Sequence, residues 1–200
     1  MAKKKIDAST EEKIIEAARK VFTEKGYAAT RTRDIAEEAG LNLALLNYYF
    51  RSKEKLFSLV MAEKIGQLFG VIAPIVNDDK TSLQEKIELI VPAYLNVLLQ
   101  NPGLPLFVLS EIRNNPEHFS NRVQAGKILT QSVLVKQLLE KQPNVNPLQF
   151  ILNLLGMCIF PFVTKPVFEA SGLLNKASFN QLIEERKTLI VKWVNLMLDN

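Results

Sequence analysis

Apolar residues recur every three or four positions along most of this 200-residue chain, and this spacing predicts amphipathic α-helices. Residues 10–25 and 176–198 are typical stretches, and no segment alternates strictly between apolar and polar residues as a half-buried strand would. The pattern therefore predicts an all-α fold: a three-helix head with a helix-turn-helix, followed by a larger helical bundle. We expect the head at residues 1–56 and the bundle at residues 57–200.

Two short helices joined at a glycine form the most informative stretch of the chain. The first, residues 32–39, has Ile35 and Ala36 on its apolar side, and a threonine hydroxyl is expected to cap its start. Gly40 follows, where a left-handed residue ends a helix without a Cβ clash. Ala36 is a small residue where the two helices would touch, and Gly40 lies at the turn between them. Both suit two helices that cross at a steep angle.

The second helix, residues 43–50, has Leu43, Leu46 and Phe50 on one stripe, and Asn42 precedes it as the expected N-cap. Its opposite stripe carries Ala44, Asn47, Tyr48 and Arg51. Together the two helices predict a helix-turn-helix, whose second helix enters the major groove of DNA. An ordinary helical hairpin with the same core is the alternative.

The sequences on both sides of this stretch carry a family resemblance. Ahead of it a helix has AA and F before a glycine; within it stands T…DIAEEAGL; behind it comes YYF-x-SKE-x-LF. With these motifs, residues 10–60 closely resemble the DNA-binding domain of the tetracycline-repressor (TetR) family of bacterial transcription regulators. The resemblance implies a double-stranded DNA operator as partner and a homodimer formed through the last two helices.

The resemblance also indicates which residues contact DNA. The family often has Ser-Lys-Gly-Thr before Leu-Tyr, whereas this chain has Asn-Leu-Ala-Leu before Leu46-Asn47, so a relative's base preference does not carry over. Lys53 follows Ser52 at a helix start, where free N–H groups favour phosphate. The expected DNA-binding residues are Thr32, Arg33, Asn42, Leu43, Ala44, Asn47, Tyr48, Tyr49 and Lys53.

Charge supports DNA binding without proving it. The net charge is +4, and residues 1–56 hold twelve Lys or Arg against nine Asp or Glu, so most of the positive excess lies in the predicted head. Charged stretches are also the normal solvated face of a protein. Lys3, Lys4 and Lys5 suit either a DNA-binding arm or a solubilising tail.

The bundle is expected to hold a mainly apolar cavity for a small-molecule effector, because Pro92 should kink its helix and aromatic residues are available nearby. A solid core without a cavity is the alternative. Pro116 should begin one helix that reaches about Lys141. The expected ligand-binding residues are Tyr94, Phe107, Glu111, Phe150, Asn153 and Phe160.

The stretch from residue 142 to residue 164 contains no charged residue, so a membrane span has to be weighed. Prolines and asparagines interrupt the stretch, which favours a buried helix and no membrane. The apolar part of this stretch, residues 150–163, and the helix at 176–198 have more apolar surface than one small core needs. This surplus predicts a homodimer with Trp193 or its neighbours buried at or near the interface.

The sequence contains no recognisable set of catalytic residues. The chain lacks a glycine-rich phosphate loop, a CxxC pair, HExxH and GxSxG, and its single histidine, His118, is expected at the surface. We therefore expect no enzyme, no cofactor and no metal site. Cys158 cannot form an internal disulfide, and with no apolar leader pattern at the N-terminus the cytoplasm is the expected compartment.

Three functions remain open at this stage. The sequence favours a ligand-responsive transcription regulator, most simply a repressor. The second is a DNA-binding protein that responds to a protein partner instead of a small molecule. The third is a helical carrier of lipids or other hydrophobes in which the helix-turn-helix is incidental.

Overall fold

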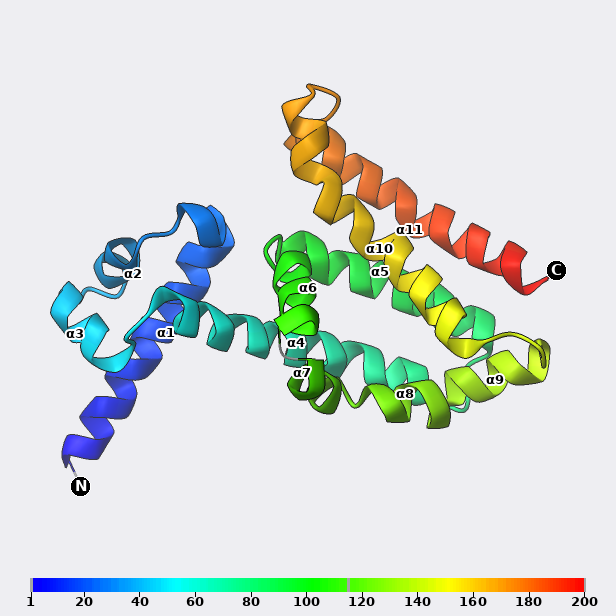
Figure 1. The fold of residues 1–200 in the computed structure, drawn as a ribbon, viewed down its shortest axis with the longest axis horizontal. Coiled ribbons are helices and arrows are strands. Elements are labelled where there is room, and N and C mark those ends of the chain that lie inside the picture. The colour runs from blue at the N-terminus through cyan, green and yellow to red at the C-terminus, as the bar shows by residue number, and fades with distance from the viewer. Residues whose placement is uncertain (1, 115, 200) are drawn as a thin grey trace. The chain divides into compact units, whose positions relative to one another are not determined.

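The computed structural model describes residues 2–114 and 116–199, with all their side chains except those of residues 2–8, 118, 122, 125 and 129. The described residues are almost entirely α-helical and contain no strand, as the periodicity predicts (Figure 1). The expectations for the side chains of Lys3, Lys4, Lys5 and His118 lie outside the described part of the chain.

The chain divides into two compact units, Met1–Gly66 with Asn101–Leu104, and Gln67–Gln100 with Pro105–Asn200. The division falls within the long helix α4, which contributes residues to both units. In chain order the helices are α1 (Ala2–Ala29), α2 (Thr32–Glu38), α3 (Leu43–Tyr49), α4 (Lys53–Asn77), α5 (Leu83–Gln100), α6 (Leu104–Asn114), α7 (Pro116–Val123), α8 (Ala125–Gln131), α9 (Val133–Lys141), α10 (Pro147–Ala170) and α11 (Lys176–Leu198).

In the first unit, the core forms where the apolar stripes of α1 to α4 meet. Helix α1 breaks at Gly26, whose φ of 72° is a left-handed conformation that glycine adopts without a Cβ clash. Next to this break, the rings of Phe22 and Tyr27 pack against Phe57 of α4, with centroids 4.9 and 4.7 Å from it. The buried side chains of the unit include Ile14, Ala17, Ala18, Val21, Phe22, Ile35, Ala36, Leu46, Phe50, Leu56, Val60, Met61 and Ile65.

In the second unit, α5 contacts α9, α10 and α11 (Figure 1). Helix α10 buries Phe150, Leu154, Cys158 and Phe162, which are spaced four residues apart and so form one stripe. Burial raises the pKa of the Cys158 thiol to about 12. Cys158 is therefore an inert small hydrophobic residue in this core, as its apolar setting suggests.

Pro161 lies inside α10 and has no N–H to donate to the carbonyl of Met157 one turn earlier. Arg186 of α11 fills this gap, since its Nη2 donates a hydrogen bond to the Met157 carbonyl oxygen at 2.8 Å. The same guanidinium lies 5.5 Å from the centroid of the Trp193 ring. Pro161 thus leaves the Met157 carbonyl oxygen of α10 free to accept a hydrogen bond from α11, and this bond links the two helices.

The prediction of one helix from Pro116 to about Lys141 is wrong. Gln124 adopts a left-handed φ of 50° and Ser132 an extended ψ of 150°, so the segment forms α7, α8 and α9 instead. Ser132 then caps α9, because its hydroxyl oxygen accepts the N–H of Val135 at 3.3 Å. Neither break is marked by glycine or proline, the residues that usually announce one.

Lys86 on α5 is fully buried, which its charge gives no reason to expect. Its Nζ donates to the carbonyl oxygen of Thr81 at 2.6 Å and to the Thr81 hydroxyl at 2.9 Å. Gln137 of α9 donates to the same Thr81 carbonyl at 2.8 Å. The group ties the start of α5 to α9 through polar contacts.

By length and composition, α4 and α10 could each cross a membrane, which by itself is weak evidence because core helices of soluble proteins also satisfy the test. Both helices place apolar stripes in the cores described above. Their apolar character is accounted for in part by this packing.

Candidate nucleic-acid interface

The start of α2 is fixed by a carboxylate and not by a threonine. Arg31 is the N-cap, and its backbone N–H donates to the Asp34 carboxylate at 2.9 Å, which holds the pKa of Asp34 below its usual value. Thr30 instead donates its hydroxyl to the Gly26 carbonyl at 2.6 Å. The prediction of a threonine cap is therefore wrong, because the Thr30 side chain is already used to brace the break in α1.

The turn and the cap of α3 form as the sequence predicts. Gly40 has a φ of 67°, and the N–H of Leu41 donates to the Ala36 carbonyl at 2.9 Å, which closes the end of α2. Asn42 caps α3, since its Oδ1 accepts the N–H of Leu45 at 2.8 Å. These local bonds determine the direction in which α3 leaves the turn.

Helix α3 has one buried and one exposed side. Leu46 and Phe50 are buried, whereas Ala44, Asn47 and Tyr48 are exposed. Tyr48 is 78% exposed, and its ring meets that of Tyr49 edge to face at 5.3 Å. A large aromatic side chain held this far out of the core is available to a partner.

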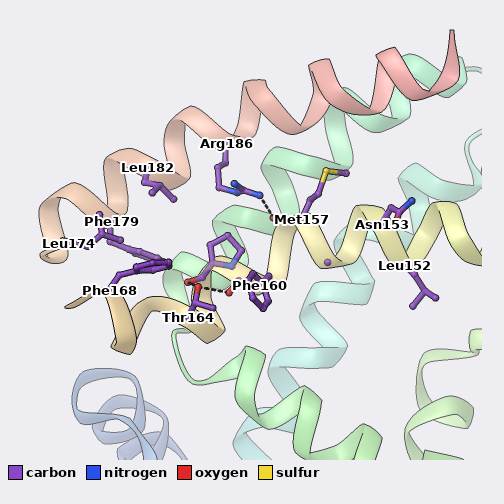
Figure 2. Close-up of a pocket in the computed structure, with 12 residues that line it drawn as sticks. Leu152, Asn153, Met157, Phe160, Thr164, Phe168, Leu174, Phe179, Leu182 and Arg186 are labelled. Carbon is purple, nitrogen blue, oxygen red and sulfur yellow. Dashed lines mark hydrogen bonds between the residues drawn. The ribbon is translucent and has the colours of Figure 1, made fainter. Parts of the chain in front are cut away.

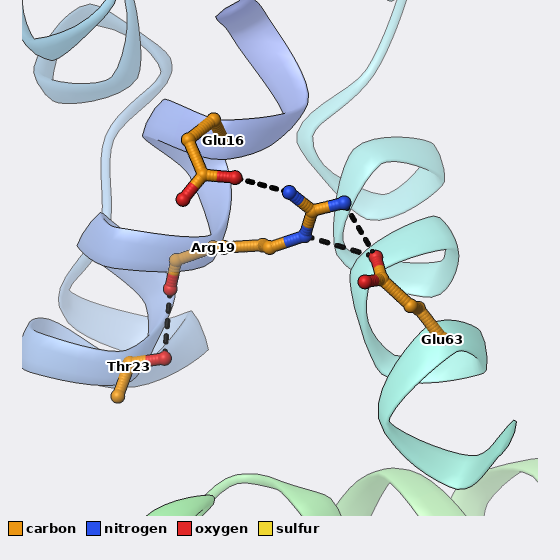
Figure 3. A network of polar contacts seen from close by, with 4 residues as sticks. All are labelled: Glu16, Arg19, Thr23 and Glu63. Carbon is orange, nitrogen blue, oxygen red and sulfur yellow. Dashed lines mark hydrogen bonds and ion pairs between the residues drawn. The ribbon is translucent and has the colours of Figure 1, made fainter. Parts of the chain in front are cut away.

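Ion pairs attach α1 to both α2 and α4. Lys20 pairs with Glu38 at 2.6 Å and Lys25 with Asp34 at 3.4 Å, which joins α1 to α2. Figure 3 shows Arg19 between Glu16 of its own helix and Glu63 of α4, to which its Nε donates at 2.9 Å. These side chains are partly exposed to water, so each pair contributes little to stability.

Lys53 at the first position of α4 is held by the protein itself. Its Nζ donates to the carbonyl oxygens of Tyr27 at 2.9 Å and Thr30 at 3.0 Å, and lies 4.1 Å from the centroid of the Tyr27 ring. Ser52 caps the same helix end by accepting the N–H of Lys55 at 3.1 Å. Lys53 therefore joins the start of α4 to Tyr27 near the end of α1 and to Thr30 just after it, a role that the sequence did not reveal.

The structure places the expected DNA contacts on neighbouring elements: the start of α2, the cap and exposed side of α3, and the start of α4. Arg33, Asn42, Ala44, Asn47 and Tyr48 are exposed, and Thr32, Leu43, Tyr49 and Lys53 are half-buried. Exposed Arg31 and Lys55 lie at the same two helix starts and could have been named from their position beside the caps.

The expected ligand-binding residues are not all brought together. A hollow of about 580 Å³ lies between α10 and α11, and Asn153 and Phe160 line it (Figure 2). Its lining is mainly apolar, with Thr164 and Arg186 as further polar side chains. Tyr94, Phe107, Glu111 and Phe150 do not line it.

Three of these four residues lie in the interior of the second unit. Phe107 and Phe150 are buried, and burial raises the pKa of Tyr94. Within the described residues, no cluster of three histidine, cysteine or acidic side chains could hold a metal ion.

Comparison with known proteins agrees with the geometry. Residues 14–60 match the family described as bacterial regulatory proteins, tetR family. The chain is 27% identical over 161 residues to the probable HTH-type transcriptional regulator YttP of Bacillus subtilis, covering 78% of each chain. It is 28% identical over 102 residues to the fatty acid metabolism regulator protein of Bacillus subtilis, covering 51% of this chain and 52% of that protein.

The fold is shared with solved structures over nearly the whole chain. The transcriptional regulator FadR from Bacillus subtilis, solved in complex with stearoyl-CoA, aligns with a TM-score of 0.60 at 19% identity, over 90% of this chain and 97% of that one. An exposed second helix in a helix-turn-helix, matched by known regulators, defines a DNA-binding transcriptional regulator. The DNA-binding part of the chain, residues 14–60, matches the TetR family of such regulators. The relatives that it matches are transcriptional regulators, so the chain is not an enzyme.

Proposed function

We propose that this chain is a ligand-responsive repressor that binds a two-fold operator as a homodimer and is released by a small, largely apolar effector. The observation that carries the proposal is the exposed side of α3, where Asn47 and Tyr48 project from a helix whose other side is fixed in the core. We assign DNA binding to residues 1–56 and regulation with dimerisation to residues 57–200. The reducing cytoplasm is the proposed compartment, since it suits the unpaired Cys158.

The proposed dimer is supported by apolar side chains that α10, α11 and the loop between them leave exposed. A two-fold dimer pairs the same surface of both copies, which would bury these side chains and present two copies of α3 to two half-sites. The exposed residues are Leu148, Leu152, Leu155, Phe160, Val167, Phe168, Leu173, Leu189, Trp193, Leu196 and Met197.

The proposed effector is supported by the apolar interior of the second unit and by the stearoyl-CoA bound to the FadR relative. Tyr94, Phe107, Glu111, Phe150, Asn153 and Phe160 remain the proposed ligand-binding residues. An effector with equal affinity for both conformations would not shift the equilibrium between them. The effector must therefore bind the conformation that does not bind DNA more tightly.

A protein partner in place of a small-molecule effector is the second candidate. It is favoured by α6, where Leu106, Leu109 and Ile112 are 56%, 42% and 47% exposed. An apolar surface of this kind suits docking of another protein. Leu109→Ser would reduce regulation by a protein partner and leave regulation by a small ligand unchanged.

Fluorescence anisotropy with the upstream DNA of the gene tests the proposal, combined with a thermal-shift screen of apolar compounds and acyl-CoA thioesters. We expect a dimer to bind this DNA more tightly than a scrambled duplex. A compound that raises the melting temperature should also weaken DNA binding. Specific DNA binding that no stabilising compound weakens would refute the effector, and the scrambled duplex binding equally well would refute the operator.

A further inference from the structure

The recognition helix α3 carries no charged side chain. Its seven residues, Leu43 to Tyr49, include neither Arg, Lys, Asp nor Glu. Its exposed positions are Ala44, Asn47 and Tyr48, so the groove meets a methyl group, an amide and a phenol ring. This composition limits which base edges the helix is able to read.

In the major groove each base presents its own pattern of hydrogen-bonding groups. Guanine is most often read by a bidentate arginine or lysine, and cytosine donates to a carboxylate. Adenine pairs with the amide of asparagine or glutamine, and the thymine methyl group takes apolar contacts. Helix α3 offers partners for adenine and thymine and lacks the usual partners of guanine and cytosine.

We infer that α3 selects A·T base pairs, with Asn47 reading adenine and Ala44 contacting a thymine methyl group. This inference rests on the proposed DNA-binding function and names the base pairs that the operator carries beneath α3. Within the described residues the Asn47 amide has no hydrogen-bond partner, so its donor and acceptor are both available. Ala44 and Asn47 are three residues apart and therefore neighbours on the helix surface, which suits adjacent base pairs.

Tyr48 adds apolar contact next to Asn47. Its ring is held by the edge-to-face contact with Tyr49 and is 78% exposed, so it presents carbon surface as well as a hydroxyl. Leu43, half-buried at the start of the helix, extends the same apolar contact. Apolar side chains of this kind favour a groove wall lined with thymine methyl groups.

The positive charges lie outside α3. Arg31 and Arg33 are exposed at the start of α2, and Arg51 and Lys55 are exposed beyond the end of α3. Cations placed on both sides of the reading helix suit the phosphates, which supply affinity without sequence information. In this arrangement the charged residues set affinity and the uncharged helix sets base preference.

Selection of full-length protein on a library of randomised duplex DNA, followed by anisotropy titrations, tests the inference. We expect selected half-sites to carry adjacent A·T pairs at the positions whose preference Asn47→Ala weakens. Replacing one such pair by G·C should weaken binding roughly 5- to 150-fold, whereas Asn47→Ala should bind both duplexes with nearly equal affinity. Asn47→Arg should shift the preference at that position toward guanine.

Lys55→Ala is the matched control, since it removes an exposed charge outside α3 and should weaken all sequences alike. Circular dichroism melting of each variant checks that the fold is kept. Selected half-sites with G·C pairs where Asn47→Ala acts, or an adenine preference that survives Asn47→Ala, would overturn the inference and leave the regulator standing. If the selection enriches no sequence at all, both the inference and the proposed function as a sequence-specific regulator are wrong.

Discussion

Replacing Lys53 by alanine removes the side chain that joins the start of α4 to Tyr27 near the end of α1 and to Thr30 just after it. Its ammonium group donates to the carbonyls of Tyr27 and Thr30 at 2.9 and 3.0 Å and lies over the Tyr27 ring. The wild-type chain should therefore be more stable than the variant, and the loss should concentrate in the DNA-binding unit.

The size of the loss follows from these contacts. Hydrogen bonds to charged groups contribute about 1.5–3 kcal/mol when well buried, and a cation–π contact at an exposed site about 0.5–1 kcal/mol. Lys53 is half-buried, and water replaces part of what the variant loses. We expect the free energy of unfolding to fall by about 1–2 kcal/mol.

Urea denaturation of Lys53→Ala beside Lys55→Ala measures this directly. Lys55 is exposed on the same helix turn, so its replacement removes the same charge without these carbonyl contacts and should change stability by less than about 0.5 kcal/mol. If both variants unfold at the same urea concentration, the bracing role assigned to Lys53 is wrong.

The same variant also tests the proposed phosphate contact. Lys53→Ala should weaken binding to all sequences alike and lower the slope of log affinity against log salt by about one per protomer. Titrations at several salt concentrations measure this slope. If Lys53→Ala changed base preference while Asn47→Ala left it unchanged, the assignment of the two faces of the interface would be wrong.

Two further predictions concern acid stability and assembly. The Arg31 N–H lowers the folded-state pKa of Asp34, so the stability that Asp34 adds is complete above its unfolded pKa of about 3.9 and is lost as the pH falls through the folded value. In urea denaturations at a series of pH values, the free energy of unfolding of Asp34→Asn should fall less at acid pH than that of the wild type. The same fall in both proteins would contradict this prediction. Trp193, 38% exposed on α11, should be needed for the proposed dimer. Light scattering should report a dimer for the wild type and a monomer for Trp193→Lys, and a monomeric wild type at micromolar concentration would refute the dimer.

The helix-turn-helix could be predicted closely because its determinants are local. Gly40 supplies the left-handed turn, Asn42 caps the helix that follows it, and Leu46 and Phe50 lie on the stripe that becomes buried. Each of these features depends on residues a few positions apart, which a sequence pattern records. The class of protein follows from the same stretch.

Features that depend on distant partners could not be predicted. Lys53 reaches back to the carbonyls of Tyr27 and Thr30, and Arg186 reaches the carbonyl that Pro161 leaves unpaired on another helix. Lys86 is buried, and its ammonium group donates to the Thr81 carbonyl. In all three cases a charged side chain satisfies backbone acceptors, and the sequence does not show which acceptors lack a partner.

The lining of the expected ligand pocket could not be predicted either, because it also depends on residues that are distant in the sequence. Asn153 and Phe160 line the hollow on α10 and α11, whereas Phe107 and Phe150 pack into the core. Aromatic residues suit both a cavity wall and a filled core, so their presence in the sequence does not decide between them.

DNase I footprinting of the DNA upstream of the gene tests the central claim most directly. If two copies of α3 read a two-fold operator, the protein should protect two similar half-sites whose centres lie about one helical turn apart, roughly 10 base pairs, or a multiple of it. Asn47→Ala should lose this protection at protein concentrations where the wild type still shows it. Uniform protection along the whole fragment, unchanged by Asn47→Ala, would contradict the claim.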